Sequence, residues 1–137
     1  MGHCRDIFLI SPAGSPGGGG EIRLTNDEYM NTQPAWSPDG EQILFVSDRD
    51  GEGVMDIWIM DRTGGNKRKI LDCDKNCYSP SFSPDGQTIA FQKYRADLKG
   101  GDIYTVDING QGLRRVTTSG FAGSPSWSPW IFEAPAP

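Results

Sequence analysis

Two short acidic runs of the chain have the spacing at which carboxylates could hold a calcium ion. Their oxygen-bearing side chains are Asp48, Asp50 and Glu52 in SDRDGEG, and Asp72, Asp74 and Asn76 in DCDKN. Calcium needs about six or more convergent oxygen ligands, and neither run forms the full twelve-position loop with a closing Glu. We therefore interpret these side chains as solvated turn residues and predict no metal site.

The residues that catalysis would need are largely missing from the sequence. His3 is the only histidine and stands next to the chain terminus, so a Ser-His-Asp or Cys-His set has no usable base. The nucleophile motif G-x-S-x-G does not occur either. We predict no catalytic residue and no cofactor, and expect that this chain is not an enzyme.

Charge and hydrophobicity limit the kinds of partner. A net charge of −5 argues against nucleic acid, because a phosphate backbone is usually bound by a basic face. No apolar run approaches the roughly 20 residues that span a bilayer, so we expect no membrane insertion. The stretch 7–10 is too short for the apolar core of a secretion signal, so the localisation stays unknown from these residues.

An internal repeat indicates the elements that position these side chains. PAWSPDG at 34–40 returns as PSFSPDG at 80–86 and begins again as PSWSPW at 125–130. Trp36 and Phe82 are 46 residues apart, and Phe82 and Trp127 are 45 apart. A period of this length, with no helical periodicity inside it, is typical of β-propellers.

Each repeat has the pattern of four short strands joined by turns. In the first complete unit we expect strands at 33–37, 42–47, 56–60 and 67–71, with a type I turn at Pro38–Gly40. The second unit repeats the turn at Pro84–Gly86. The second and third strands are apolar at consecutive positions, as in a sheet covered on both faces, while the fourth is basic, as in an exposed edge. The sequence therefore predicts an all-β partial β-propeller of four-stranded antiparallel blades.

The two units resemble the WD-repeat-like propeller repeats of the TolB family, from about residue 6 to 130. They are PAWSPDGEQILFVSDRDGEGVMDIWIMDRTGGNKRKIL and PSFSPDGQTIAFQKYRADLKGGDIYTVDINGQGLRRVT. The resemblance implies a fragment of a six-bladed propeller that binds proteins in the bacterial envelope, where TolB meets the peptidoglycan-associated lipoprotein. A periplasmic setting would permit a Cys73–Cys77 disulfide, whereas a reducing cytosol would leave two thiols. Cys4 has no obvious partner in the sequence.

The two ends of the chain match incomplete blades. DIFLI at 6–10 and EIRLT at 21–25 match the third and fourth strands, and the turn between them is longer by four residues, which Gly17–Gly20 fit. We expect a half blade at 1–33, full blades at 34–79 and 80–124, and the start of another blade at 125–137. Trp130 replaces the turn Asp. A homodimer could complete the ring, with the end of each chain, including a substitute strand at 130–133, filling the half blade of the other.

Repeated charged and aromatic residues have structural explanations in this scheme. Two pairs recur in the loop between the second and third strands, Arg49 with Asp56 and Arg95 with Asp102, and we interpret them as structural ion pairs. We assign five aromatic side chains to packing between blades: Trp36, Trp58, Phe82, Tyr104 and Trp127.

Two functions agree with the repeat. The first is a non-catalytic scaffold that binds a protein or peptide through the loops at 25–33, 72–79 and 118–124, which lead from one blade to the next. The expected contact residues are Asp27, Glu28, Tyr29, Asp72, Asp74, Tyr78 and Phe121. The alternative is a substrate-gating propeller of a prolyl oligopeptidase-like or tricorn-like hydrolase, because such peptidases carry the same repeat.

Overall fold

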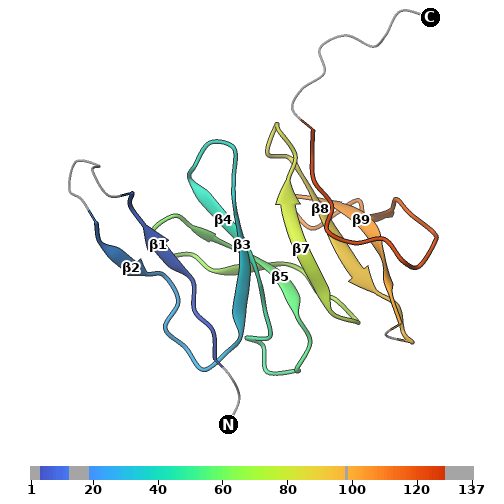
Figure 1. The fold of residues 1–137 in the computed structure, drawn as a ribbon, viewed down its shortest axis with the longest axis horizontal. Helices are drawn as coiled ribbons and strands as arrows, with labels where there is room; N and C mark the ends of the chain where they lie inside the picture. Colours follow the sequence, from blue (N-terminus) through green and yellow to red (C-terminus); the bar gives the residue numbers. More distant parts are fainter. Residues whose placement is uncertain (1–3, 13–18, 98, 129–137) are drawn as a thin grey trace, which may run out of the picture.

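The chain folds into successive β-sheets that stand side by side (Figure 1). The computed structural model describes residues 4–12, 19–97 and 99–128, and these form ten strands and no helix. Among the described residues there is accordingly no helix long and apolar enough to cross a membrane. The prediction of an all-β protein is confirmed.

Each sheet is antiparallel and follows chain order. The half blade pairs β1 (Phe8–Ile10) with β2 (Glu21–Arg23). The first full blade contains β3 (Asn31–Trp36), β4 (Gln42–Ser47), β5 (Asp56–Asp61) and β6 (Arg68–Leu71). The second full blade contains β7 (Cys77–Phe82), β8 (Thr88–Tyr94), β9 (Gly101–Asp107) and β10 (Arg114–Arg115). The predicted four-stranded blades are therefore present, although β10 has only two residues.

The SPDG motif forms the tight turn between the first two strands of each blade. The Ser37 hydroxyl donates to Asp39 Oδ1 over 2.6 Å, and the same oxygen accepts the N–H of Glu41. Gly40 has a φ of 73° and donates its N–H to the Ser37 carbonyl. The second copy repeats the hydroxyl contact at 2.5 Å, from Ser83 to Asp85. Both predicted turns are confirmed, and the repeated Ser and Asp are explained by their hydrogen bonds to each other.

Alternate side chains of β4 belong to two different cores. Ile43 and Phe45 pack with the half blade, and Leu44 and Val46 pack with the second full blade. All four are 3% exposed or less. The sheet is thus covered on both faces, as the run of consecutive apolar residues predicts.

The aromatic residues assigned to packing between blades have different environments. Phe82 is buried at 8% exposure, in the core shared by the two full blades. Trp36 is 49% exposed because no inner strand of the half blade lies against it among the described residues, and Trp127 is 37% exposed. Trp36 lines a hollow with Leu9, Ile22 and Leu24 of the half blade, and Trp127 contacts β7, so both lie between successive units although neither is buried. Trp58 and Tyr104 are half-buried at the edges of these cores.

Glycines in the turns between the third and fourth strands permit close contact between blades. Gly64 and Gly110 have φ values of 88° and 83°, in the left-handed region that favours glycine. A Cβ atom on Gly64 would lie 2.8 Å from the Leu24 carbonyl oxygen, and one on Gly110 would lie 2.5 Å from that of Ile70. Each turn therefore packs against the outermost strand of the preceding blade.

The third copy of the inner strand begins with the backbone geometry of the first two. Gln33, Ser79 and Ser124 occupy equivalent positions and have φ values of 53°, 54° and 50°. The indole N–H of Trp127 donates to the Ser81 carbonyl over 3.2 Å, so this segment lies against β7. The substitute strand at 130–133 with Trp130, the first two glycines of the insertion at 17–20, and His3 lie outside the described residues. The boundaries between repeats stay predictions.

The loop between the two full blades is closed by a disulfide. Cys73 and Cys77 are bonded with a Cα–Cα distance of 6.2 Å, and both are buried. Of the two states considered for Cys73 and Cys77, a disulfide or two thiols, the structure has the disulfide. Cys4 is exposed, and its thiol donates to the Glu28 carbonyl.

Candidate functional site

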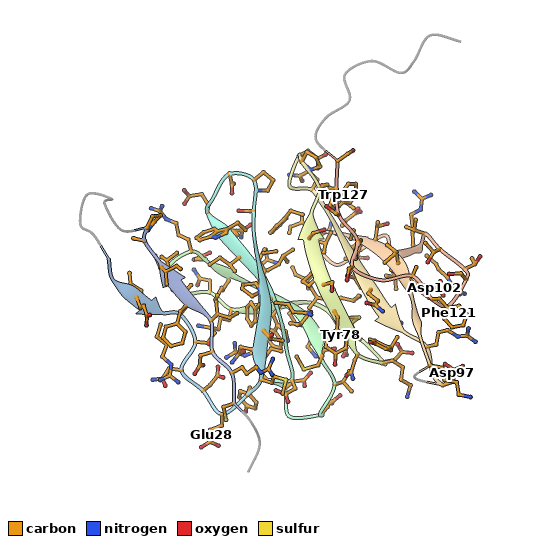
Figure 2. The ribbon with its side chains drawn as sticks, viewed as in Figure 1. Glu28, Tyr78, Asp97, Asp102, Phe121 and Trp127 are labelled. Carbon is orange, nitrogen blue, oxygen red and sulfur yellow. A yellow bond between two sulfur atoms is a disulfide. The ribbon has the colours of Figure 1, made fainter. Side chains whose placement is uncertain are left out.

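The antiparallel order of the strands gives each full blade two distinct ends. The turns within the first and last strand pairs, near residues 37–41, 62–67, 83–87 and 108–113, lie at one end. The opposite end, which we call the loop end, carries the connections at 24–30, 48–55, 72–76, 95–97 and 116–124. Glu28 and Asp97 mark the loop end along the lower edge of Figure 2.

Five of the predicted contact residues are exposed at the loop end. Asp72 and Asp74 are 77% and 75% exposed but lie beside lysines, whereas Glu28, Tyr29 and Phe121 project into solvent without an ion pair among the described residues. Glu28 is exposed, Tyr29 is 37% exposed and Phe121 is 82% exposed. The backbone on both sides of Phe121 is held by the second full blade, because Gly120 donates to Asp102 Oδ1 and Ala122 donates to the Gly101 carbonyl, each over 2.9 Å. These three residues could contact a partner without rearrangement of the loops.

Asp27 has internal partners. Its Oδ2 lies 3.1 Å from Nη2 of Arg49, and its Oδ1 accepts the side-chain N–H of Asn31 over 2.6 Å. The Arg49 guanidinium lies 5.2 Å above the centre of the Trp58 ring, which favours its position further. Asp27 therefore orders the loop before β3, and its availability for a partner is limited.

Asp74 makes a similar contact in the second full blade. Its Oδ1 lies 2.6 Å from Nζ of Lys93, and this hydrogen bond lowers the pKa of Asp74. The Lys93 ammonium lies 5.6 Å from the Tyr104 ring. In both blades a basic residue thus joins an aromatic side chain of the third strand to a carboxylate of the preceding loop.

Tyr78 belongs to a strand and packs inside the fold. It lies in β7 opposite Gln92, and its ring meets the Tyr94 ring edge-on with centroids 5.5 Å apart. Burial raises the pKa of the half-buried phenol, and the neighbouring Tyr94 adds to this effect. The structure therefore places Tyr78 among packing residues, apart from the exposed set.

Asp72 belongs to a carboxylate cluster around a lysine. Oxygens of Asp50, Asp56 and Asp72 lie within 4.8 Å of one another, so the cluster combines residues from both acidic runs. Nζ of Lys69 lies 2.5 Å from Asp50, 3.3 Å from Asp56 and 3.4 Å from Asp72. The lysine ammonium already supplies the positive charge that a metal ion would bring to these oxygens.

The members of this cluster differ in their acidity. Burial raises the pKa of Asp56 to about 6, and the neighbouring Asp50 carboxylate contributes to the shift. The hydrogen bond from Lys69 lowers the pKa of the more exposed Asp50 and raises that of the lysine. A buried carboxylate of this kind serves structure here, because its Oδ1 also accepts the Cys73 N–H over 2.6 Å.

The predicted pairs of Arg49 with Asp56 and Arg95 with Asp102 are wrong. Arg49 reaches Asp27, and Arg95 lies 3.6 Å from Asp97. The aspartate near the start of each third strand instead pairs with a cation on the fourth strand, which β-sheet pairing places nearby. These pairs are Asp6 with Arg23, Asp56 with Lys69 and Asp102 with Arg115. The signal was available in the sequence, since Arg23, Lys69 and Arg115 follow one another at intervals of 46 residues.

These aspartates also hold the connections between blades. Asp56 and Asp102 accept backbone N–H groups of Cys73 and Gly120, the residues that lead into the following blade or segment. Burial alone would raise the pKa of Asp102, but the hydrogen bonds that it accepts from Gly120, Thr117 and Arg115 outweigh burial and lower it. The repeated charged residues thus have a structural role, as predicted, but their ion-pair partners differ from the predicted ones.

The described part of the loop end has features of a binding surface. Its carboxylates near the predicted site, Asp27, Asp72 and Asp74, lie against cations, and the chain's single histidine is outside the described residues. Exposed aromatic side chains on loops that a rigid sheet holds are typical of protein recognition. The geometry is suited to binding a surface or segment of another protein.

Two solved structures resemble the fold of this chain over part of its length. The structure of a putative TolB from Agrobacterium tumefaciens matches with a TM-score of 0.63 and 31% identity, over 70% of this chain and 36% of that one. The tricorn protease matches with a TM-score of 0.53 and 27% identity, over 64% of this chain and 8% of that one.

Two curated relatives match the sequence, one named as a Tol-Pal system protein and one as a peptidase. The Tol-Pal system protein TolB 1 of Novosphingobium aromaticivorans is 36% identical over 70 residues, which are 51% of this chain and 14% of the relative. The uncharacterized peptidase YuxL of Bacillus subtilis is 43% identical over 54 residues, which are 39% of this chain and 8% of the relative. This chain therefore spans a small part of the length of each. The family described as the TolB beta propeller domain matches residues 4–131, and the chain belongs to that family.

Proposed function

We propose that the chain is part of a non-catalytic scaffold that binds a protein or peptide at the loop end. The observation that carries the proposal is the side chain of Phe121, which is 82% exposed although hydrogen bonds hold the backbone on both sides of it. A large apolar side chain kept in water on an ordered loop costs free energy that burial against a partner recovers. Glu28 and Tyr29 extend the contact surface to the first full blade.

The cell envelope is the compartment that best suits this function. A relative named as a Tol-Pal system protein supports an envelope role, and the Cys73–Cys77 disulfide is the kind of bond that an oxidising compartment maintains. We propose a periplasmic location. The peptidoglycan-associated lipoprotein, which the TolB resemblance implies, is the first partner to test.

A capture experiment with matched surface variants tests the binding function. The immobilised chain is exposed to an envelope extract of the source organism, and bound proteins are identified by mass spectrometry. We expect one partner to be retained by the wild type and by Leu113→Ser, which changes a 45% exposed side chain at the opposite end of the blade. Phe121→Ser should lose that partner. Equal retention by both variants would exclude Phe121 from the interface.

A gating propeller of a hydrolase is the second candidate, and the similarity to the peptidase YuxL and to the tricorn protease favours it. In that case the catalytic residues belong to another part of the parent protein. The test is the sequence of the parent beyond residue 137. A G-x-S-x-G motif followed by a distant histidine would support a hydrolase, and a stop codon would support the scaffold.

A homodimer that completes the half blade is a further part of the proposal. Phe8, Ile10, Ile22 and Trp36 are 48%, 68%, 57% and 49% exposed around β1 and β2, and a second copy would cover them. Light scattering should then give a mass of about 30 kDa, twice that of the 15.0 kDa chain, and deletion of residues 124–137 should abolish the dimer. A stable monomer of the intact chain would rule the dimer out.

A further inference from the structure

The two full blades carry opposite charge at the loop end. The first has a majority of carboxylates, namely Asp27, Glu28, Asp48, Asp50, Glu52, Asp56 and Asp72, against Arg49 and Lys69. The second has a majority of cations, namely Lys75, Lys93, Arg95, Lys99 and Arg115, against Asp74, Asp97 and Asp102. A basic surface is unexpected in a chain whose net charge is −5, and its concentration on one blade points to a negatively charged ligand.

The cations of the second blade surround a cavity of about 440 Å³, which we call the basic pocket. It is lined by the four cations Lys75, Lys93, Arg95 and Arg115, by the two carboxylates Asp74 and Asp102, and by Tyr94 and Tyr104. This volume lies in the range of about 300–1,000 Å³ that is common for ligand sites. The residues come from four different segments of the chain, so the pocket exists only in the folded blade.

Two of the cations are held by internal ion pairs. Lys93 lies 2.6 Å from Asp74, and Arg115 lies 2.5 Å from Asp102. These contacts neutralise both cations and fix the wall of the pocket. Lys75 and Arg95 then supply the charge that remains available for a ligand.

Lys75 and Arg95 have few competing contacts. Lys75 is exposed and makes no ion pair with any residue that the structure describes. Arg95 has a side chain that is 49% exposed and a single long ion pair of 3.6 Å with the half-exposed Asp97. Such a contact is worth about 0.2–1 kcal/mol or less in water, so a better-placed carboxylate can replace it.

The basic pocket is continuous with the surface proposed for protein binding. A methyl group added at Gly120 would collide with the Arg95 guanidinium, so this guanidinium lies directly against the residue before Phe121. Phe121 and Asp102 lie near each other on the same side of the blade in Figure 2. A partner that covers Phe121 therefore reaches the pocket without leaving the loop end.

We propose that the basic pocket binds an acidic segment of the protein partner, with a carboxylate held between Lys75 and Arg95. The planar guanidinium can donate two parallel hydrogen bonds to one carboxylate, and the Tyr94 ring lines the same pocket beside it. The inference rests on the proposed binding function and specifies the chemistry of the partner. The carboxylates of the first blade disfavour a long polyanion, which would have to cross them, and so favour a short peptide segment over nucleic acid.

The test uses a defined peptide in place of the unidentified partner. A fluorescein-labelled hexaglutamate amide is titrated with the full chain, and fluorescence anisotropy reports binding, with hexaglutamine as the uncharged counterpart. We expect saturable binding of hexaglutamate only, weakened as salt rises from about 0.02 to 0.15 M. The double variant Lys75→Gln with Arg95→Gln should bind at least about tenfold more weakly.

A control with the same change in charge separates site binding from general attraction. Arg62→Gln with Arg68→Gln removes two exposed cations at the end of the first full blade opposite to the loop end, and this variant should keep wild-type affinity. A second variant, Lys75→Glu with Arg95→Glu, should abolish binding of hexaglutamate. Equal weakening by the pocket and control variants would overturn the proposal, as would tighter binding of a single-stranded DNA hexamer than of hexaglutamate.

The outcome for the pocket can be distinguished from that for the proposed function. If the Lys75→Gln, Arg95→Gln variant captures the same envelope protein as the wild type, the scaffold function stands and the basic pocket is not its contact. If no variant and no wild-type protein captures a partner, the scaffold function fails. If hexaglutamate still binds saturably to the wild type and weakly to the pocket variant in that case, the basic pocket binds acidic segments but the proposed scaffold function is wrong.

Discussion

Truncation of Phe91 to alanine should destabilise the protein more than any comparable change on its surface. Phe91 is fully buried in the core that joins the two full blades, and its ring stacks on Tyr104 with centroids 6.0 Å apart. Loss of a buried Phe side chain costs about 3–5 kcal/mol, because burial is lost and a cavity remains. That is a large fraction of the about 5–15 kcal/mol that holds most domains folded.

Thermal and urea denaturation measure this loss. At about 3 °C per kcal/mol for a chain of this size, Phe91→Ala should lower the melting temperature by about 10 °C or more. The matched control is Phe121→Ala, the same substitution at a side chain that is 82% exposed, which should leave the melting temperature within about 2 °C. Similar melting temperatures for the two variants would refute the inference that β8 joins the blades through its buried face.

Three further changes test individual contacts. Gly110→Ala should cost more than Gly51→Ala in urea denaturation: both glycines have a φ of 83°, but only at Gly110 would the added Cβ meet a backbone oxygen, that of Ile70, at 2.5 Å. Equal costs would exclude the steric contribution. The pKa of Asp56, raised from 3.8 to about 6, means that the folded state keeps this proton longer than the unfolded chain; the contribution of Asp56 to stability should therefore fall as pH rises from 4 to 6, and Asp56→Asn should remove that part of the pH dependence of the urea midpoint. Cys77→Ser removes the disulfide, which closes a loop with a sequence separation of 4, and should lower the free energy of unfolding by about 2 kcal/mol. Under reducing conditions the wild type lacks the bridge too, so there the variant and the wild type should have the same stability.

The strands were predictable because their signals are local. The predicted strand at 42–47 agrees with β4 residue for residue, since alternate faces of one sheet are covered by two neighbours and the whole run must be apolar. The turns at Gly40 and Gly86 were equally predictable, because glycine at positive φ is required there. The exposure of Trp36 could not be predicted from the sequence, because it depends on which strands of the adjacent half blade lie beside this residue.

The candidate site was predictable only in part, because its contacts depend on register. Phe121, Glu28 and Tyr29 lie on loops, where composition alone suggests exposure. The partners of Asp27 and Asp74 are Arg49 and Lys93, which approach from other strands, so sequence distance offered no guide to them. The basic pocket was missed for the same reason, since its cations are dispersed along the chain and are gathered only by the sheet.

The sharing of each sheet between two cores has a consequence for synthesis on the ribosome. Leu44 and Val46 are covered by the second full blade, whose strands are translated after the first blade is complete. At about 5–20 residues per second, the roughly 46 residues of the next repeat take about 2–9 s to appear. The apolar face of a nascent blade is therefore open to chaperones for several seconds before its neighbour can cover it.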